Sequence, residues 1–242
     1  MNSVVKPSSR KRRRPDVVEV RPDRKAEILL AAEKLFAQNG YHAVTIRQIA
    51  EEAKVPLALV GYYYGQKHEL FEAIFVHWNH TIEERMNALQ AAQRVPLDAQ
   101  TLHRIITAFV NPVLRMRASP EGEYYALLIA RELSFTTDVT DRILRTYFDP
   151  MANAFIEALN QVHPNTSRGQ IAWCYQFALG ALIHHMSDVR VKRLSQNQSA
   201  PGDPDAHAML INFIVGGIRA ALAPADQASL PSTPRKTTRR SP

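Results

Sequence analysis

The chain has almost no cysteine and no long hydrophobic run. Cys174 is the single cysteine among 242 residues, so an intramolecular disulfide and a cysteine-based zinc site are both excluded. The most apolar stretch, residues 171–186, is shorter than the roughly 20 residues that a bilayer requires, and the N-terminus has no apolar segment typical of a signal peptide. These absences predict a cytoplasmic protein without a membrane span, in which Cys174 is a buried structural thiol.

The motifs of common enzyme classes are also missing. The sequence has no GxSxG nucleophile motif, no cysteine–histidine dyad, no HExxH zinc motif and no phosphate-binding loop. Its nine histidines, including the adjacent His184 and His185, show no metal-ligand spacing. We therefore expect no enzymatic activity, no metal and no cofactor.

Excess positive charge is confined to the two ends of the chain. The formal net charge is +7, but residues 10–14 carry five positive charges and residues 235–240 carry four, which leaves −2 for the remainder. Composition without periodicity predicts disordered basic tails at residues 1–21 and 224–242. The tails either assist DNA binding by neutralising phosphates or only increase solubility, and the sequence leaves both interpretations open.

A capping pattern and a proline divide residues 45–67 into two short helices. Thr45, with Gln48 three residues later, forms a capping box that satisfies free N–H groups at a helix start. Pro56 disfavours helix at the residue before it and suits a first helical turn, and Gly65 ends the second helix. Two short helices across a tight turn predict a helix-turn-helix that enters the DNA major groove.

The second of these helices has the composition of a DNA-contacting element. Ala58 and Gly61 allow a close approach of the backbone, and three consecutive tyrosines follow at residues 62–64. We expect Tyr64 to point inward and Tyr62 or Tyr63 to donate to a phosphate, whereas Arg47 is either a DNA contact or a solvated charge. The candidate DNA-binding residues are Thr45, Arg47, Gln48, Pro56, Leu57, Ala58, Gly61, Tyr62, Tyr63 and Lys67.

Residues 45–70 resemble the DNA-binding motif of the TetR family of transcriptional regulators. The matching positions are Thr45, Ile49, Ala50, Ala53, Val55, Tyr62, Tyr63, Gly65, Lys67, Glu69 and Leu70. The departures are Lys54 at a turn position usual for glycine, Pro56 and Gln66 at positions usual for serine, and Gly61 at a position where tyrosine is common. The resemblance implies that Lys67 contacts a phosphate and that a homodimer binds a palindromic operator. It also implies that the last two helices pair with those of a second copy.

The remaining pattern predicts an all-α fold with an N-terminal three-helix head, residues 22–78, and a larger helical ligand-binding and dimerisation domain, residues 79–223. Apolar spacing after Lys67 predicts one long helix, broken by Pro96, whose residues 70–89 would act as a lever between the two parts. Asp98 is expected to cap the next helix, and Pro112 and Pro150 to kink two neighbouring helices and leave a cavity between them. The last two helices are expected at residues 167–191 and 205–222. The first of these is apolar nearly all round in its first half, which predicts burial against a partner subunit.

The predicted cavity implies a mainly apolar or aromatic small-molecule effector. For Arg131, a structural salt bridge is favoured over a role as an anion anchor. The stretch 60–65 also looks somewhat like a subgroup that responds to long-chain acyl compounds, which is an alternative effector class. The candidate ligand-binding residues are Phe109, Tyr124, Leu128, Arg131, Phe148, Met151, Phe155, Trp173 and Phe177.

Three classes of function are compatible with parts of this sequence. A DNA-binding transcriptional regulator, in most such proteins a repressor released by an inducer, explains both the helix-turn-helix and the large apolar C-terminal part. An all-α enzyme lacks a catalytic constellation. An architectural DNA-binding protein without sequence preference, the alternative, explains the basic tails but not the C-terminal part. The regulator is therefore the predicted function.

Overall fold

A computed structural model describes residues 23–119, 121–134 and 137–223, and every regular element within these ranges is helical. The two predicted basic tails lie outside the described residues. We call the first four helices the head: α1 (Arg24–Asn39), α2 (Ile46–Glu52), α3 (Leu57–Tyr64) and α4 (Lys67–His77). The other elements form the body: α5 (Asn79–Gln93), α6 (Thr101–Ala118), α7 (Gly122–Ser134), α8 (Asp138–Ile143), the π-helical turn η1 (Leu144–Phe148), α9 (Asp149–Val162), α10 (Arg168–Ser187), α11 (Arg190–Leu194), the 3-10 turn η2 (Pro204–Ala206) and α12 (His207–Ala221).

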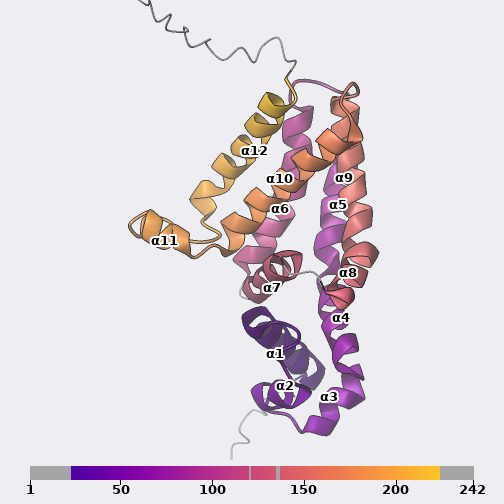
Figure 1. Ribbon diagram of the computed structural model, residues 1–242, viewed down its shortest axis with the longest axis vertical. Helices are drawn as coiled ribbons and strands as arrows, with labels where there is room; N and C mark the ends of the chain where they lie inside the picture. Colours follow the sequence, from indigo (N-terminus) through magenta and orange to yellow (C-terminus); the bar gives the residue numbers. More distant parts are fainter. Residues whose placement is uncertain (1–22, 120, 135–136, 224–242) are drawn as a thin grey trace, which may run out of the picture.

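The head lies at one end of the molecule and the long helices of the body extend away from it (Figure 1). Asp23 caps α1 by accepting from the N–H groups of Lys25 and Ala26, and Gly40, with φ 84°, ends it. Phe36 of α1 and Phe71 of α4 meet edge to face in the head core, with ring centroids 5.1 Å apart. The buried apolar residues of head and body belong to one contiguous cluster. The head is therefore packed onto the body, chiefly through α1 against α7.

The predicted lever is interrupted at Trp78, which corrects the expectation of one long helix. Trp78 has φ −88° and ψ 3° and separates α4 from α5. Its carbonyl accepts from both the N–H and the hydroxyl of Thr81, at 2.9 and 2.7 Å, while its indole N–H donates to the buried carboxylate of Glu33 at 2.8 Å. The N–H of Trp78 still donates to the carbonyl of Ile74, whereas its carbonyl accepts from Thr81, three residues on, as in a 3-10 turn. The two halves of the lever thus meet at a side chain anchored in the head.

A π-helical turn interrupts the long helix predicted around Pro150. The N–H of Asp149 donates to the carbonyl of Leu144, five residues back, and Pro150 then occupies the first turn of α9. Proline lacks an N–H and its ring crowds the preceding turn, so a wider turn just before it relieves the clash. In contrast, α6 continues through Pro112 from Thr101 to Ala118.

Three predicted helix ends also differ. Asp98 was predicted to cap α6, but the cap residue is Gln100 and the helix begins at Thr101. The Asp98 carboxylate instead accepts from the N–H of Gln100, just before the helix. α10 ends at Ser187 and α11 is a separate short helix, so Val191 is not part of α10. The 3-10 turn η2 precedes α12, which starts at His207 rather than Asp205.

Candidate DNA-binding head and effector cavity

The predicted capping box at the start of α2 is present. The Thr45 hydroxyl accepts from the N–H of Gln48 at 3.3 Å, and the Gln48 side-chain oxygen accepts from the N–H of Thr45 at 2.8 Å. The turn after α2 is fixed equally well: the N–H of Lys54 donates to the carbonyl of Glu51, and the N–H of Val55 donates to that of Ala50. This pair of bonds is a Schellman motif. Lys54 has φ 55°, as its glycine-type position predicts, so α2 and α3 are held at a defined angle.

The three tyrosines of α3 differ in their exposure to solvent. Tyr62 is 79% exposed and Tyr63 also faces solvent, with the two rings 5.1 Å apart. Val60 is buried beneath them. Tyr64 points inward, as predicted, and its hydroxyl donates to the carbonyl of Lys25 in α1 at 2.9 Å. The helix is therefore anchored by Val60 and Tyr64, while its outer face is free to contact another molecule.

The other DNA-binding candidates lie around this outer face. Lys67 at the start of α4 is half-buried, and its ammonium lies 4.5 Å from the centroid of the Tyr41 ring. Burial lowers the pKa of Lys67 below its usual value. Arg47 is exposed and its guanidinium forms an ion pair with Glu51 at 3.1 Å. Every remaining candidate has an exposed residue surface: Thr45, Gln48, Pro56, Leu57, Ala58 and Gly61.

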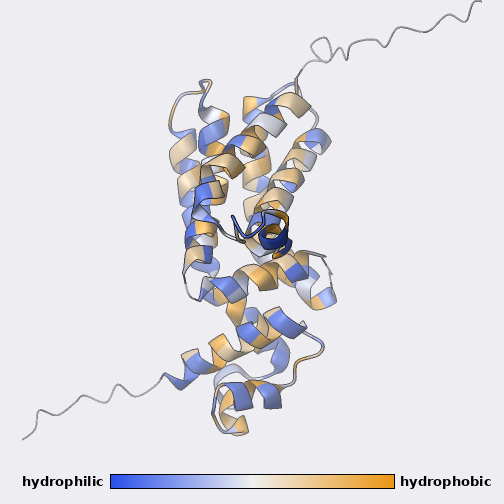
Figure 2. Ribbon diagram, turned by 90° about the vertical axis from the view of Figure 1, so that its left-hand side faces the viewer, coloured by the Kyte–Doolittle hydropathy of each residue, from blue (hydrophilic) through white to orange (hydrophobic). Residues whose placement is uncertain are grey.

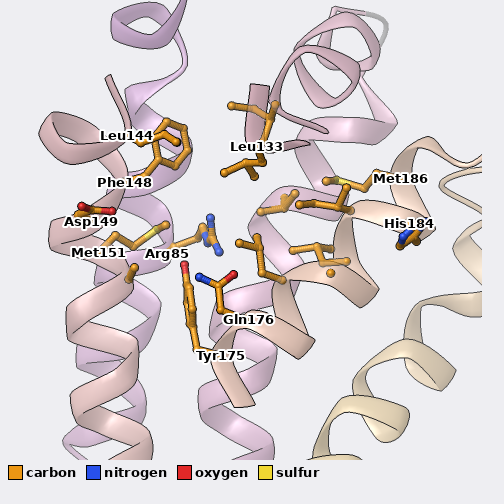
Figure 3. Close-up of a pocket in the computed structure, with 17 residues that line it drawn as sticks. Arg85, Leu133, Leu144, Phe148, Asp149, Met151, Tyr175, Gln176, His184 and Met186 are labelled. Atoms are coloured by element: carbon orange, nitrogen blue, oxygen red, sulfur yellow. The ribbon is translucent and has the colours of Figure 1, made fainter. Parts of the chain in front are cut away.

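The body contains a cavity of about 420 Å³ among α5, α6, α7, η1, α9 and α10. Phe148 and Met151, both predicted ligand contacts, line it together with residues that the sequence reasoning did not name (Figure 3). Phe109, Leu128 and Phe155 are instead packed in the core beside it. The cavity lies next to Pro150, as predicted, although the wall there is a π turn.

Four predicted cavity residues lie elsewhere. Trp173 and Phe177 are 63% and 64% exposed on the outside of α10, where their rings stack 5.5 Å apart. Tyr124 lines a separate hollow between α1 and α7. Arg131 donates to the carbonyls of Gln38 and Asn39 at 3.3 and 3.2 Å. It is thus structural, as favoured, but it binds the C-terminal end of α1 rather than a carboxylate.

Arg85 lines the cavity but is not among the ligand-binding residues predicted from the sequence. It projects from α5 into the cavity and is only 6% exposed, with its guanidinium carbon 4.3 Å from the centroid of the Phe109 ring (Figure 3). Within Glu83-Glu84-Arg85 it looks like one more solvated charge. The available signal was its spacing, because Ile82, Arg85 and Leu89 share one helical face and all three are buried.

Two walls of the cavity are bonded directly to the head. Ile129 and Leu133 line the cavity from α7, the helix that carries Arg131 and its bonds to the end of α1. Leu144 and Phe148 line it from η1, and the intervening Tyr147 donates its hydroxyl to Glu72 of α4 at 3.1 Å. The helix or turn that forms each of these walls is therefore joined to a head helix by one hydrogen-bonded side chain.

The outer face of α10 and α12 carries large exposed apolar side chains. Besides Trp173 and Phe177, Met209 and Phe213 of α12 are exposed. A groove of about 250 Å³ runs between the two helices. In Figure 2, viewed from the side of α11, the ribbon of the body is coloured largely as hydrophobic around α11. Among the described residues, no helix is long and apolar enough to span a membrane, and no three potential metal ligands come together.

A helix-turn-helix head on an all-helical body with a cavity between the body helices defines the class of helix-turn-helix transcriptional regulators. Residues 28–74 match the sequence profile described as bacterial regulatory proteins, tetR family, and residues 107–217 match the tetracyclin repressor-like C-terminal domain. The chain belongs to the TetR family of transcriptional regulators. Such regulators are not enzymes; they bind DNA as dimers, respond to small molecules and are typically repressors.

Similar proteins agree with this assignment. The HTH-type transcriptional regulator BetI of Brucella canis is 29% identical over 197 residues, which cover 81% of this chain and 92% of that protein. HbdR of Aromatoleum sp. is 45% identical over 56 residues, 23% of each chain. Among solved structures, the hemolysin II transcriptional regulator HlyIIR has a TM-score of 0.57 at 22% identity, covering 80% of this chain and 96% of that one. The fatty acid degradation regulator FadR of Bacillus halodurans has a TM-score of 0.55 at 15% identity, covering 82% and 98%. At these identities the structural likeness shows the fold.

Proposed function

We propose that this protein is a repressor that binds a palindromic operator as a homodimer and leaves it when a small-molecule inducer fills the cavity of the body. The observation that carries this proposal is the outer face of α3, where Tyr62 and Tyr63 are exposed on a helix whose position is fixed by the capped α2 and by Tyr64. A rigid helix with exposed hydroxyls and small residues suits the major groove. We also propose that the functional boundary between head and body lies near residue 78.

The proposed DNA-binding residues fall into groups with different chemical roles. Tyr62, Tyr63 and Lys67 are suited to phosphates, because they offer hydroxyl and ammonium donors at the end of α3 and the start of α4. Ala58 and Gly61 let the backbone approach the groove, and Arg47 can exchange its exposed ion pair with Glu51 for a phosphate or a base edge. Thr45 and Gln48 contribute by fixing the start of α2 as well as by their exposed surface.

The proposed dimer forms through the outer face of α10 and α12. Trp173, Phe177, Met209 and Phe213 give this face the exposed apolar surface that a partner subunit would cover. A β-carbon placed on Gly216 or Gly217 would meet no atom within 4 Å, so a partner helix can approach the backbone of α12 closely. A two-fold dimer presents two α3 helices, which fit successive major grooves when they are about 34 Å apart.

Induction follows from the bonds between the cavity walls and the head. An inducer that binds one arrangement of α7 and η1 better than the other shifts the population toward it by its difference in affinity. The contacts of Arg131 with α1 and of Tyr147 with α4 carry that shift to the head. The two α3 helices then lose the spacing that the operator requires.

The test is selection of bound DNA from a genomic-fragment library at near-physiological salt. We compare the wild-type protein with a Tyr62→Ala, Lys67→Ala double variant and with Lys192→Ala, a matched control that removes an exposed lysine of α11. The expected result is enrichment of one palindrome by the wild type and by the control, with affinity at least about 100-fold lower in the double variant. Circular dichroism and thermal unfolding verify that the double variant is folded.

Two outcomes would contradict the proposal. One is binding that is indifferent to sequence, and the other is selective binding that the double variant retains. Either would mean that the outer face of α3 does not read the operator.

A further inference from the structure

Arg85 is a buried cation whose hydrogen-bonding groups are left unused by the protein. Its Nε and Nη2 are buried and have no hydrogen-bond partner, and within the described residues Arg85 forms no ion pair. The side chain is held against the Phe109 ring and faces the cavity, where the neutral Tyr175 and Gln176 lie beside it (Figure 3). Buried charges are normally paired and buried donors normally have an acceptor, because an unpaired buried charge or an unsatisfied buried donor costs free energy.

The guanidinium remains charged in this environment. Burial lowers the pKa of Arg85 to about 10, which is still well above neutral pH. The cavity therefore contains one full positive charge. Asp149, also on the cavity wall, forms no ion pair with it, so within the described residues no carboxylate pairs with the guanidinium.

The geometry of the free donors selects a planar anion. Nε and Nη2 form one edge of the guanidinium, and their two N–H bonds are nearly parallel. A carboxylate accepts such a pair with both oxygens, which is the bidentate arrangement that arginine favours.

We propose that the cavity binds a monoanionic organic acid, whose carboxylate pairs with the Nε and Nη2 edge of Arg85 and whose apolar body contacts the aliphatic and aromatic wall. This inference rests on the proposed function, in which the cavity holds the effector, and it gives the effector a chemical class. The apolar contacts come from Val113, Leu144, Phe148, Met151, Leu179 and Ile183.

Two features narrow the ligand further. A single guanidinium balances one negative charge, and Asp149 on the same wall disfavours a second, so a carboxylate fits better than a phosphate dianion. The volume of about 420 Å³ is at the small end for ligand sites, which favours a compact body. Arg85 lies on α5, the half of the lever that belongs to the body and meets the head at Trp78. The proposed salt bridge with the ligand carboxylate would therefore form on the lever itself.

The test is binding of paired probes to the purified full-length protein by calorimetry and thermal shift. Hexanoate, octanoate, phenylacetate and 2-naphthoate are each compared with the primary amide of the same skeleton, and phenyl phosphate is included as a dianion. We expect at least one carboxylate to bind about 10-fold or more tightly than its amide. Arg85→Met should remove this preference, Arg85→Lys should keep part of it, and the control Arg94→Met, which removes an exposed arginine at the C-terminal cap of the same helix, should keep all of it.

Several results would overturn the proposal. These are equal affinity for acid and amide, unchanged carboxylate affinity in a folded Arg85→Met variant, preference for phenyl phosphate, or no binding by any carboxylate of the panel. Operator binding by the ligand-free protein is measured separately. Loss of operator binding with intact carboxylate binding would contradict the proposed function alone, whereas the reverse result would contradict the ligand class alone.

Discussion

Glu33 of α1 is a buried carboxyl at the contact between head and body. It is 1% exposed, one oxygen accepts from the Trp78 indole and the other has no hydrogen-bond partner. Burial, the largest cause, and the nearby Glu121 carboxylate raise the pKa of Glu33 from 4.5 to about 7, against the opposing effect of the Trp78 bond. The folded protein therefore holds this proton at pH values where the unfolded chain has released it.

This raised pKa predicts a specific pH dependence. Stability from protonated Glu33 is fully present below about pH 4.5 and is lost as the pH rises through about 7. Glu33→Gln keeps an acceptor for Trp78 and removes the titration. The free energy of unfolding of the variant, relative to the wild type, should therefore rise by up to about 3 kcal/mol between pH 4.5 and pH 8. Urea unfolding at a series of pH values measures it, and a pH-independent difference would refute the assignment.

The turn after α2 provides a second prediction at this scale. Lys54 adopts φ 55°, a conformation that costs a residue with a β-carbon about 1 kcal/mol. Lys54→Gly should raise the free energy of unfolding by up to about 1 kcal/mol, since it removes that cost. Lys54→Ala is the control, because it removes the charge but keeps the β-carbon. Equal stabilities of the two variants by thermal unfolding would show that φ is not responsible.

Features that depend on local sequence patterns could be predicted from the sequence, whereas contacts between residues distant in the chain could not. The Thr45–Gln48 capping box, the unusual conformation of Lys54 and the inward Tyr64 follow from neighbours within a few positions. The free guanidinium edge of Arg85 depends on the absence of a carboxylate from several distant helices, and no local pattern reports that. Arg131 likewise binds carbonyls about 90 positions away in the chain.

At the scale of elements, η1 and α7 connect the cavity to the head. Tyr147→Phe removes the hydroxyl that donates to Glu72, and Arg131→Met removes the donors to the end of α1. Neither side chain lines the cavity. In the double variant we expect the inducer to lower operator affinity by about 10-fold less than in the wild type, with inducer affinity itself nearly unchanged.

Operator titrations with and without a carboxylate that binds the wild type measure this coupling. Arg145→Met is the control, because it removes an exposed arginine of the same π turn that pairs with Asp141. An undiminished inducer effect in the double variant would exclude these two contacts as the route.

Helices were predictable as elements, but their interruptions were not. Apolar spacing gave the sequence positions of the helices, because the buried face repeats every three or four residues. The break at Trp78 depends on the Thr81 hydroxyl and the buried Glu33, and the π turn before Pro150 depends on how one helix accommodates a proline. For α10, composition correctly indicated apolar surface beyond the core, but not which side of the helix carried Trp173 and Phe177.

At the scale of the whole molecule, operator recognition requires two heads held at a fixed distance. Phe177→Asp with Phe213→Asp places two charges on the proposed dimer face, where burial against a partner would cost several kcal/mol. Both side chains are exposed in the single chain, so the variant should fold normally. We expect it to be monomeric by analytical ultracentrifugation and to bind the operator at least about 100-fold more weakly. If the variant still formed a dimer, the interface would have to lie on another face of the molecule.

The most direct test of the account is the dependence of affinity on the spacing of the two operator half-sites. Affinities are measured for the selected palindrome, for one half-site alone, and for the palindrome with five base pairs, about half a helical turn, inserted at its centre. The account predicts a dimer bound to the intact palindrome and affinity at least about 100-fold lower for both altered sites. Equal affinity for the palindrome and the five-base-pair insertion would contradict a mechanism in which two α3 helices read the operator in fixed register.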